Sequence, residues 1–457
     1  MGDPMSPRVL LVALLLPWLA SAAPKPDIVF LLIDDLGYAD CGFNGGKQIH
    51  TPTIDRLAKA GAVLEHHYVQ PVCSPTRSTL LTGRYPTRTG VYSIVSPHAA
   101  WGLPLAERTL ADALKQAGYS TEIVGKWHLG EFKPEYLPLA RGFDHHYGHY
   151  FGMLDYFTHL RGGELDWYRD GKPVKEEGYT THLLRDEACR VIARQPKDKP
   201  LFLYVPFNGV HGPFQAPEAY LKPYPNLKNN RQKLAGMLAA VDEAIGKIED
   251  SLRQAGRLEN TLIIFSSDNG GPPPGDNTPL RDYKGSIYEG GVRAAAFACW
   301  PGRIPAGQRV REPMHMVDWY PTLIKLGGGS LEQKLPLDGL DVWPTITQGA
   351  PTPHDAILCV STQGPARAAV RMGEWKLIQA NAAAEAAEDE NGQPLAKAKN
   401  AKTAGKYEPV ALYHLTADPG ETKNLAAEQP ERVNAMRTRL AALLKDAVPP
   451  GSTPAKK

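Results

Sequence analysis

The sequence predicts an α/β protein with a large, mostly parallel β-sheet covered by helices on both sides, followed by a smaller C-terminal α+β unit. Short apolar runs recur along the first 350 residues, helical patterns separate them, and the composition changes beyond about residue 350. A strand buried on both faces reads as a continuous apolar run, and alternating strands and helices favour a parallel sheet. The 457 residues suffice for two to three domains and a large core.

Four apolar runs predict the strands of the sheet, each short enough to be a buried strand and bounded by polar or turn residues. They are residues 28–33, 120–124, 201–207 and 261–265. Three helices are predicted at 52–60, 109–118 and 180–194. Each begins at a Pro or Thr, and a Gly marks the end of the first two. A longer helix is expected over 231–255. Its apolar face consists of Leu234, Met237, Leu238, Val241, Ile245 and Ile248.

Beyond residue 350 the patterns predict a hairpin, a third strand and a helix with an apolar stripe. Their residues are 370–371 with 375–378, then 411–415, then 431–444. Residues 382–406, rich in Ala, Glu and Lys, predict an exposed insertion. The predicted domains are therefore a catalytic domain over 23–350 and a C-terminal α+β subdomain over 351–448, with a disordered tail at 449–457.

The N-terminus is typical of an exported protein. Residues 1–22 read as a signal peptide, with a charge at Arg8, an apolar stretch over 9–19 and small residues before the cleavage site, although Met5 could be the true start. No later segment approaches twenty continuous apolar residues, so we expect no membrane span and a periplasmic or secreted protein. Lys plus Arg total 51 against 49 Asp plus Glu, and this formal charge of +2 does not indicate a nucleic-acid partner.

Five cysteines are too few for a disulfide framework in a chain of this size. One or two bridges could form among the four other than Cys73. Cys189 and Cys299, however, lie in apolar helix and strand patterns, which favour the role of a small buried hydrophobic residue.

Cys73 and Arg77 mark the start of a further helix. Pro75 suits its first turn, and Gly83 follows its last turn. Backbone N–H groups and the positive end of the helix dipole would face an anion bound at Cys73. Arg77 lies one turn later, so its guanidinium can share the face of Cys73. The plain alternative is a buried structural cysteine beside a capped helix.

Polar side chains follow each of the four predicted strands. They are Asp34 and Asp35, Lys126 and His128, His211, and Asp268 and Asn269. Ligands bind at the carboxyl ends of strands in open α/β sheets, so we expect these segments to meet at one site with Cys73. The Asp and Asn side chains offer only oxygen, and no His or Cys accompanies them at zinc-like spacing. The expected metal is therefore hard, calcium first and magnesium second.

The same site would gather positive and titratable groups around a small oxyanion. They are Arg77, Lys126, Lys284, His128 and His211. Each candidate residue, taken alone, also has an explanation without a role in the site. Acidic pairs cap helices, a lone His is more often a core or surface group, and Lys284 reads most simply as a solvated surface residue.

The run from Cys73 to Arg77, continued by residues 80–84, resembles the signature of the type I sulfatases. In that family the cysteine is oxidised to Cα-formylglycine, whose hydrate is the nucleophile. Further matching segments cover most of the mature chain: 34–37, 125–130, the His211 segment, 267–271 and 289–293. A narrower likeness to the arylsulfatase B group, the N-acetylgalactosamine-4-sulfatases, rests on 70–73, 141–144 and 338–343.

This resemblance implies an alkaline phosphatase-like sandwich, maturation by a formylglycine-generating enzyme, and one calcium ion held by Asp34, Asp35, Asp268, Asn269 and the modified Cys73. It also implies the catalytic roles.

Asp268 would help activate the attacking hydroxyl, and Arg77 would steady that hydroxyl. His211 with Lys284 would protonate or stabilise the leaving oxygen. Lys126 would neutralise sulfate oxygens, and His128 would take the proton of the second hydroxyl.

The expected substrate is a sulfated carbohydrate, and our best prediction is a sulfated hexosamine attacked from the chain end. Aromatic and His residues in or near predicted loops could line the sugar pocket. They are His66, His67, His98, Trp101, His145, His146, Tyr147, His149, Tyr150, Asp155, Tyr156 and His159.

Two other functions compete with this interpretation. One is a phosphatase or phosphodiesterase of the alkaline phosphatase superfamily. Those enzymes commonly pair two zinc ions through several His and Asp ligands, whereas here Asn269 follows Asp268 where an imidazole would be expected. The other is a non-catalytic protein that binds sulfated glycans, which would apply if Cys73 is never converted.

Overall fold

The computed structural model describes residues 24–380 and 408–451. The predicted signal peptide and insertion, and residues 452–457 of the predicted tail, lie outside these ranges. Among the described residues, a ten-stranded sheet forms the centre of the molecule, in the order β13-β2-β12-β11-β1-β10-β4-β5-β8-β9. Its strands are β1 (Asp27–Ile33), β2 (Ala62–Leu64), β4 (Ser120–Lys126), β5 (His145–His149), β8 (Tyr168–Arg169), β9 (Lys172–Pro173), β10 (Leu201–Pro206), β11 (Thr261–Ser267), β12 (Ala296–Cys299) and β13 (Gln308–Val310).

The four predicted strands are confirmed, and they form the middle of this sheet. β11, β1, β10 and β4 are neighbours, and each adjacent pair is parallel. Strand β5, which pairs parallel with β4, was not expected from the sequence. The apolar strand pattern around Cys299 corresponds to β12, which runs antiparallel beside β11. The sheet is therefore mostly parallel at its centre and mixed at its edges.

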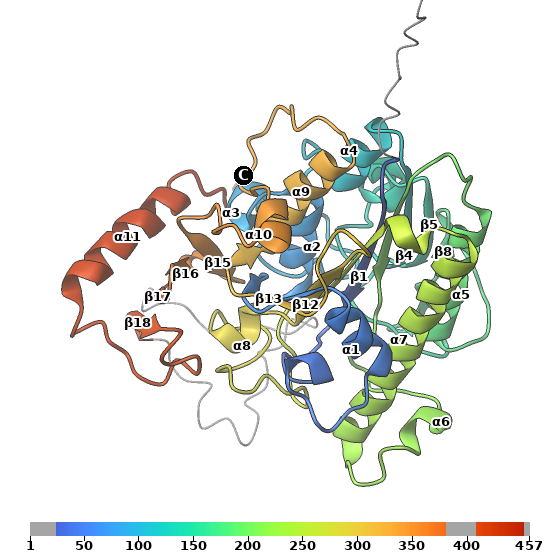
Figure 1. Cartoon of the computed structure of the whole chain (residues 1–457), viewed down its shortest axis with the longest axis horizontal. Coiled ribbons are helices and arrows are strands. Elements are labelled where there is room, and N and C mark those ends of the chain that lie inside the picture. Colours follow the sequence, from blue (N-terminus) through green and yellow to red (C-terminus); the bar gives the residue numbers. More distant parts are fainter. Residues whose placement is uncertain (1–23, 381–407, 452–457) are drawn as a thin grey trace, which may run out of the picture.

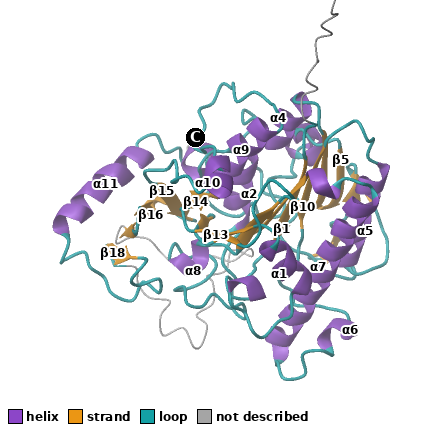
Figure 2. Ribbon diagram, in the orientation of Figure 1, coloured by secondary structure: helices purple, strands orange, loops and turns teal. Residues whose placement is uncertain are grey.

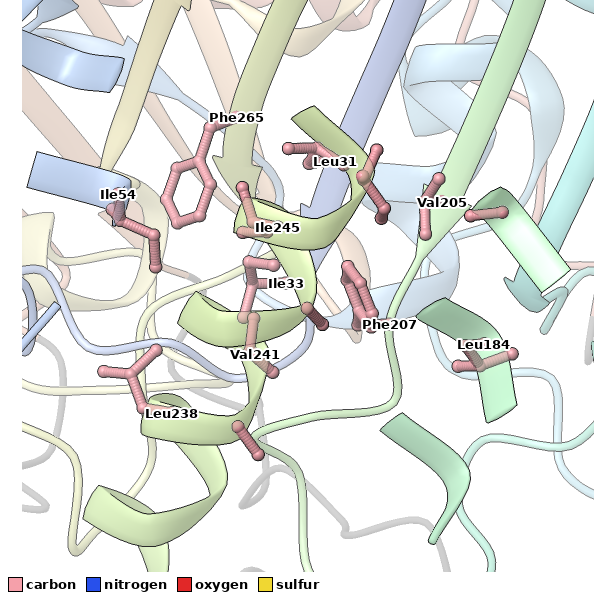
Figure 3. Packing of buried hydrophobic residues seen from close by; sticks show 14 of the residues in the cluster. Leu31, Ile33, Ile54, Leu184, Val205, Phe207, Leu238, Val241, Ile245 and Phe265 are labelled. Atoms are coloured by element: carbon pink, nitrogen blue, oxygen red, sulfur yellow. The ribbon is translucent and has the colours of Figure 1, made fainter. Parts of the chain in front are cut away.

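Helices cover both faces of the sheet (Figures 1 and 2). Val29, Leu31 and Ile33 of β1 pack into one hydrophobic cluster with helices α1 (Pro52–Lys59), α5 (Thr180–Arg194) and α7 (Asn229–Gln254). Figure 3 shows this face, where Val241 and Ile245 of α7 lie close to Ile33. The alternate residues of β1 pack on the opposite cluster, with α2 (Cys73–Thr82), α4 (Leu110–Gln116) and α9 (Trp319–Leu326).

The predicted helices are confirmed within a few residues at their ends. Thr109 caps α4 through a capping box with Asp112. The six apolar residues predicted to form the buried face of α7 are all buried in the first cluster. The remaining elements of this domain are short: α3 (Pro86–Thr89), α6 (Glu218–Leu221), α8 (Glu289–Val292), α10 (Trp343–Gln348), β3 (His67–Tyr68), β6 (Leu160–Arg161), β7 (Glu164–Leu165) and β14 (Met314–His315).

A separate antiparallel sheet and one helix form a C-terminal unit at one end of the molecule (Figure 1). The elements are β15 (Ile357–Ser361), β16 (Gly364–Met372), β17 (Trp375–Ala380), β18 (Val410–His414) and α11 (Pro430–Leu444). The predicted hairpin, third strand and helix are confirmed, and β15 is an additional strand. One face of the sheet packs on α11, and the other packs on Tyr68, Ile287, Tyr288 and Val292.

Two further expectations can be compared with the structure. All five cysteines are free, so none of the disulfide bridges considered from the sequence forms. The described chain continues past residue 449, where the tail was expected to begin, and Gly451 N–H donates to Gly90 O. Within the described ranges, no helix is both long and apolar enough to cross a membrane.

Candidate active site

The four central strands deliver their polar residues to one edge of the sheet. Asp34 and Asp35 follow β1, Lys126 ends β4, His211 lies beyond β10, and Asp268 follows β11. Because these strands are parallel neighbours, their carboxyl ends meet at the same edge. Every residue predicted to belong to the site is buried. Hydrogen bonds and ion pairs connect these residues into one cluster.

Helix α2 points its N-terminus into this cluster. Cys73 is its first residue, Pro75 lies in its first turn, and Gly83 ends it in a left-handed conformation with φ 67°. Arg77, one turn after Cys73, donates to Asp268 Oδ2 at 2.8 Å and to Lys126 O at 3.2 Å. The guanidinium therefore links α2 to the ends of β11 and β4.

Cys73 lies among acidic groups. Its Sγ is 3.7 Å from Asp34 Oδ1, and single ligand atoms of Asp34, Asp35, Cys73 and His211 all lie within 4.8 Å of one another. Asn269 Nδ2 donates to Asp35 Oδ1 at 2.7 Å, whereas the buried Asn269 Oδ1 has no hydrogen-bond partner. A buried amide oxygen without a partner is costly unless a cation or another donor occupies the site with it.

The donor set fits a hard divalent cation through its carboxylate and amide oxygens. The structure adds a point that spacing along the chain did not reveal: Cys73 and His211 are close to Asp34 and Asp35. A thiolate and an imidazole are ligands that suit zinc. The preference for calcium over zinc therefore depends on whether the side chain at position 73 offers sulfur or oxygen.

Buried cations balance the carboxylates. Lys126 Nζ lies 2.6 Å from Asp34 Oδ2, and Lys284 Nζ lies 2.8 Å from Asp35 Oδ1. The solvated surface position that Lys284 alone would suggest is therefore wrong, because its side chain is 10% exposed and paired. Arg77 completes three positive groups opposite the three carboxylates of Asp34, Asp35 and Asp268. A divalent cation and a sulfate dianion added together would preserve this balance.

Burial raises the pKa of two groups at the site, Cys73 and Asp268. It raises the pKa of the Cys73 thiol well above its usual range, although the charges of Lys126 and Lys284 oppose the change. An unmodified Cys73 is therefore a neutral thiol and a poor nucleophile. Burial and the nearby charge of Asp34 also raise the pKa of Asp268, opposed by Arg77, Lys126 and Lys284.

Two histidines lie at the site in defined orientations. His211 Nδ1 is 2.6 Å from Gly212 O and its Nε2 is 3.4 Å from Asp35 Oδ2, so each ring nitrogen faces an acceptor. A doubly protonated ring satisfies both contacts, which suits an acid. His128 has φ 59° and accepts a hydrogen bond from Ser74 Oγ at its carbonyl. Left-handed backbone at a non-glycine residue is typical of functional sites.

Ser74 had no role that the sequence predicted. Its hydroxyl donates to His128 O at 2.8 Å and accepts from Val95 N at 3.1 Å, so it joins the first turn of α2 to the β4 loop. Its position next to Cys73 was the only feature of the sequence that could have indicated a role. Its two hydrogen-bond partners, His128 and Val95, are distant from it in the sequence.

The prediction that the His-rich segment around residue 145 is a loop is wrong. Residues His145–His149 form strand β5, paired with β4, and all five are buried. The His145 ring contacts Asp170 and Glu187, and the His146 ring stacks on Tyr150. Among the predicted sugar-pocket residues, His98 is exposed, whereas His66, Trp101 and Asp155 are partly exposed. The role of each in substrate binding stays a prediction.

A model of the sulfatase family matches residues 26–329 of the chain, which include every residue of this site. The chain belongs to the sulfatase family. This sulfatase is 37% identical to mouse arylsulfatase J, over 93% of the chain and 77% of the relative. It is 32% identical to mouse N-acetylgalactosamine-6-sulfatase, over 94% and 88% of the two chains.

A solved structure agrees with these relatives. Ps i-CgsB in complex with k-i-k-neocarrahexaose superposes on the sulfatase with a TM-score of 0.84 and 32% identity, over 93% of this chain and 94% of that one. The expected family and fold class are thus confirmed, and the chain is a sulfatase enzyme. The narrower likeness to arylsulfatase B stays a prediction.

Proposed function

We propose that this sulfatase hydrolyses sulfate esters of a carbohydrate, using Cys73 converted to Cα-formylglycine and one calcium ion. One observation supports this most strongly. Cys73 begins a buried helix within 3.7 Å of Asp34 Oδ1, in a cluster that also contains Arg77, Lys126 and Lys284. This arrangement places the side chain of residue 73 where positive groups would hold the monoanionic sulfate ester.

Conversion of Cys73 resolves two difficulties of the unmodified site. A neutral thiol is a weak nucleophile, and sulfur is a soft ligand among oxygen donors. The hydrate of the aldehyde supplies a hydroxyl nucleophile toward sulfur and oxygen donors toward a hard ion. The maturation partner would be a formylglycine-generating enzyme.

The calcium ligands would be Asp34, Asp35, Asp268 and Asn269, together with the converted residue 73. The unpartnered Asn269 Oδ1 and the carboxylates of the cluster support this set. When bound, calcium supplies positive charge toward the sulfate oxygens. Arg77, bonded to Asp268, would orient that carboxylate toward the attacking hydroxyl.

The remaining groups would stabilise negative charge and transfer protons. Lys126 would donate to the sulfate oxygens, and Lys284 would stabilise the negative charge that develops on the leaving ester oxygen. His211 would donate a proton to the leaving ester oxygen, and His128 would accept the proton of the second hydroxyl of the converted side chain. Both histidines are buried at the same edge of the sheet as Cys73.

We further propose a sulfated hexosamine at a chain end as the substrate, and a periplasmic or secreted location. Support comes from the relative named N-acetylgalactosamine-6-sulfatase and from the neighbour that was solved with a carbohydrate. Residues 1–22, with their signal-peptide pattern, support export.

A two-arm experiment tests the conversion and the metal together. The protein is produced with and without a formylglycine-generating enzyme, and each sample is analysed by mass spectrometry of the Cys73 peptide, metal content, and hydrolysis of 4-nitrophenyl sulfate and 4-nitrophenyl phosphate. In the sample made with the formylglycine-generating enzyme, we expect the Cys73 peptide to be about eighteen mass units lighter than the unmodified peptide. We expect bound calcium and sulfate ester hydrolysis in that sample only.

Other results would favour the alternatives. Two zinc ions and faster phosphate than sulfate ester hydrolysis would support a phosphatase. An unmodified thiol in the natively exported protein, combined with glycan binding and no hydrolysis, would support a non-catalytic role. Either result would contradict the proposed function.

A further inference from the structure

Tyr156 is a buried tyrosine whose hydroxyl contacts the loop that carries His211. Its Oη lies 2.6 Å from Asn208 O and 2.7 Å from His211 O. Both distances are within the normal range for an O–H···O hydrogen bond, so the one hydroxyl proton is shared between the two carbonyls. Because the residue is 1% exposed, bulk water cannot replace these bonds.

The loop over 208–211 is tight and lies against the predicted metal ligands. Val210 N donates to Asp34 O at 2.7 Å, and Asp34 N donates to Gly209 O at 3.1 Å. His211 N donates to Asn208 O at 3.1 Å, so the two carbonyls that Tyr156 contacts are the two ends of one turn. The hydroxyl of Tyr156 therefore bridges the ends of the turn that sets the His211 backbone.

Tyr156 is itself held in place by several contacts. Its N–H donates to Gln215 Oε1 at 2.9 Å, and Gln215 Nε2 donates to Asp155 Oδ2 at 2.6 Å. Its carbonyl accepts from Thr180 N at 2.9 Å, and its ring stacks on Tyr179 with centroids 5.6 Å apart. The hydroxyl thus belongs to a fixed support rather than to a side chain that can follow the loop.

We propose that Tyr156 is a positioning residue that acts through His211. It holds the turn over 208–211 so that the His211 imidazole lies between Gly212 O and Asp35 Oδ2. The inference rests on the proposed function, in which His211 protonates the leaving oxygen. A displacement of about 1 Å in a proton donor costs about 100-fold in rate, and the cost falls on esters whose leaving oxygen needs the proton.

The test is Tyr156→Phe, which removes only the hydroxyl. Activity is measured on aryl sulfates from 4-nitrophenyl, a good leaving group, to 4-methoxyphenyl, a poor one. We expect kcat to fall by about 10- to 100-fold on the poor leaving group and by less than about 3-fold on the good one. Tyr92→Phe is the matched control, since it removes a buried hydroxyl that donates to Val448 O at 2.9 Å, and it should leave both rates unchanged.

A double variant decides whether the effect passes through His211. In a His211→Ala background, Tyr156→Phe should add no further dependence on the leaving group. An equal additional loss in that background, or equal losses across the whole series for Tyr156→Phe alone, would overturn the positioning role. If Tyr156→Phe does not fold, Gln215→Leu, which removes the bond to Tyr156 N–H, should show the same steeper dependence, and a flat loss would overturn the role.

The two proposals fail in different ways. A wild-type protein with a converted Cys73 and no activity on any aryl sulfate would overturn the proposed function and the role of Tyr156 together. An active wild type whose Tyr156→Phe variant loses the same factor on every ester would overturn the role of Tyr156 alone.

Discussion

At the scale of single residues, burial determines what each group of the site can do. Cys73, Arg77, Lys126 and Asp268 are all fully buried, so their charges and protons are set by one another rather than by water. Arg77 and Lys126 are paired with carboxylates, whereas the Cys73 thiol is held neutral by the rise in its pKa. Among these four residues, Cys73 is the one that the proposed function requires to be converted.

Replacing Cys73 tests this directly. We expect Cys73→Ala to abolish sulfate ester hydrolysis while the protein stays folded, because the nucleophile is removed and only a small side chain is lost. The measurement is turnover of 4-nitrophenyl sulfate, with thermal unfolding as the check on folding. Cys299→Ala is the matched control, since Cys299 is also a buried free cysteine but lies on β12. An active Cys73→Ala enzyme would refute the assignment.

His211→Ala tests the leaving-group acid. We expect a loss of about 10² to 10⁴ in kcat on alkyl sulfate esters, because a positioned acid contributes that factor. The loss should be smaller on aryl sulfates whose leaving group needs no proton. Steady-state rates on a matched alkyl and aryl pair provide the measurement, and equal losses on the two would count against His211 as the acid.

At the scale of elements, α2 shows how a helix is fixed at both ends. Its first residue lies in the acidic cluster, and its last turn ends at Gly83, whose N–H donates to Thr79 O. A Cβ at Gly83 would lie 2.8 Å from Tyr320 Cβ on α9. Both the left-handed backbone and this close contact therefore favour glycine at position 83. The position of Cys73 therefore depends on packing at the opposite end of its helix.

Gly83→Ala should destabilise the protein by about 2 kcal/mol or more, from left-handed backbone strain and the contact with Tyr320. Gly349→Ala is a matched control. Gly349 ends α10 with φ 66° and ψ 23°, close to the 67° and 21° of Gly83, but no atom lies within 4 Å of its added Cβ. Its cost should be about 1 kcal/mol, from backbone strain alone. Urea unfolding measures both, and equal costs would show that the Tyr320 contact is unimportant.

At the scale of the whole molecule, a buried ion cluster joins the C-terminal sheet to the catalytic domain. Lys376 on β17 lies 2.9 Å from Glu289 Oε1 on α8 and 3.0 Å from Glu421 Oε1. Glu289 N also donates to Glu421 Oε2 at 2.6 Å. Gly285 lies next to Lys284 and four residues before α8, and its N–H donates to Pro71 O at 2.7 Å. The C-terminal unit thus contacts α8 shortly after the segment that carries Lys284.

This cluster predicts a pH dependence of stability. Burial and the charge of Glu289 raise the pKa of Glu421 from 4.5 to about 7, opposed by Lys376. The folded protein therefore binds this proton more tightly than the unfolded chain. The stabilisation is complete below pH 4.5 and is lost as the pH rises to about 7.

Glu421→Gln should remove this contribution. We expect the difference in unfolding free energy between pH 5 and pH 7 to change by on the order of 2 kcal/mol relative to wild type, measured by urea unfolding at the two pH values. Glu431→Gln, at an exposed position of α11, is the control and should leave the pH profile unchanged. An unchanged profile for Glu421→Gln would show that Glu421 titrates normally in the folded protein.

The sequence by itself determined the four central strands, the main helices, the α2 start at Cys73 and which polar residues gather at one edge of the sheet. Apolar runs, caps and polar residues at strand ends are local patterns, and parallel strands bring their ends together by geometry alone. The sequence did not indicate β5, because His145, Gly148 and their neighbours lack a strand pattern. Its pairing with β4 and its internal hydrogen bonds, both long-range, stabilise it there.

Only the tertiary structure decided which groups face each other inside the site. It placed Cys73 and His211 in one cluster with Asp34 and Asp35, and it brought the Tyr156 hydroxyl to the His211 turn. These pairs are far apart in sequence, so no spacing rule relates them. Their distances follow from how helices and loops pack on the sheet, because that packing, unlike strand and helix formation, depends on the whole chain.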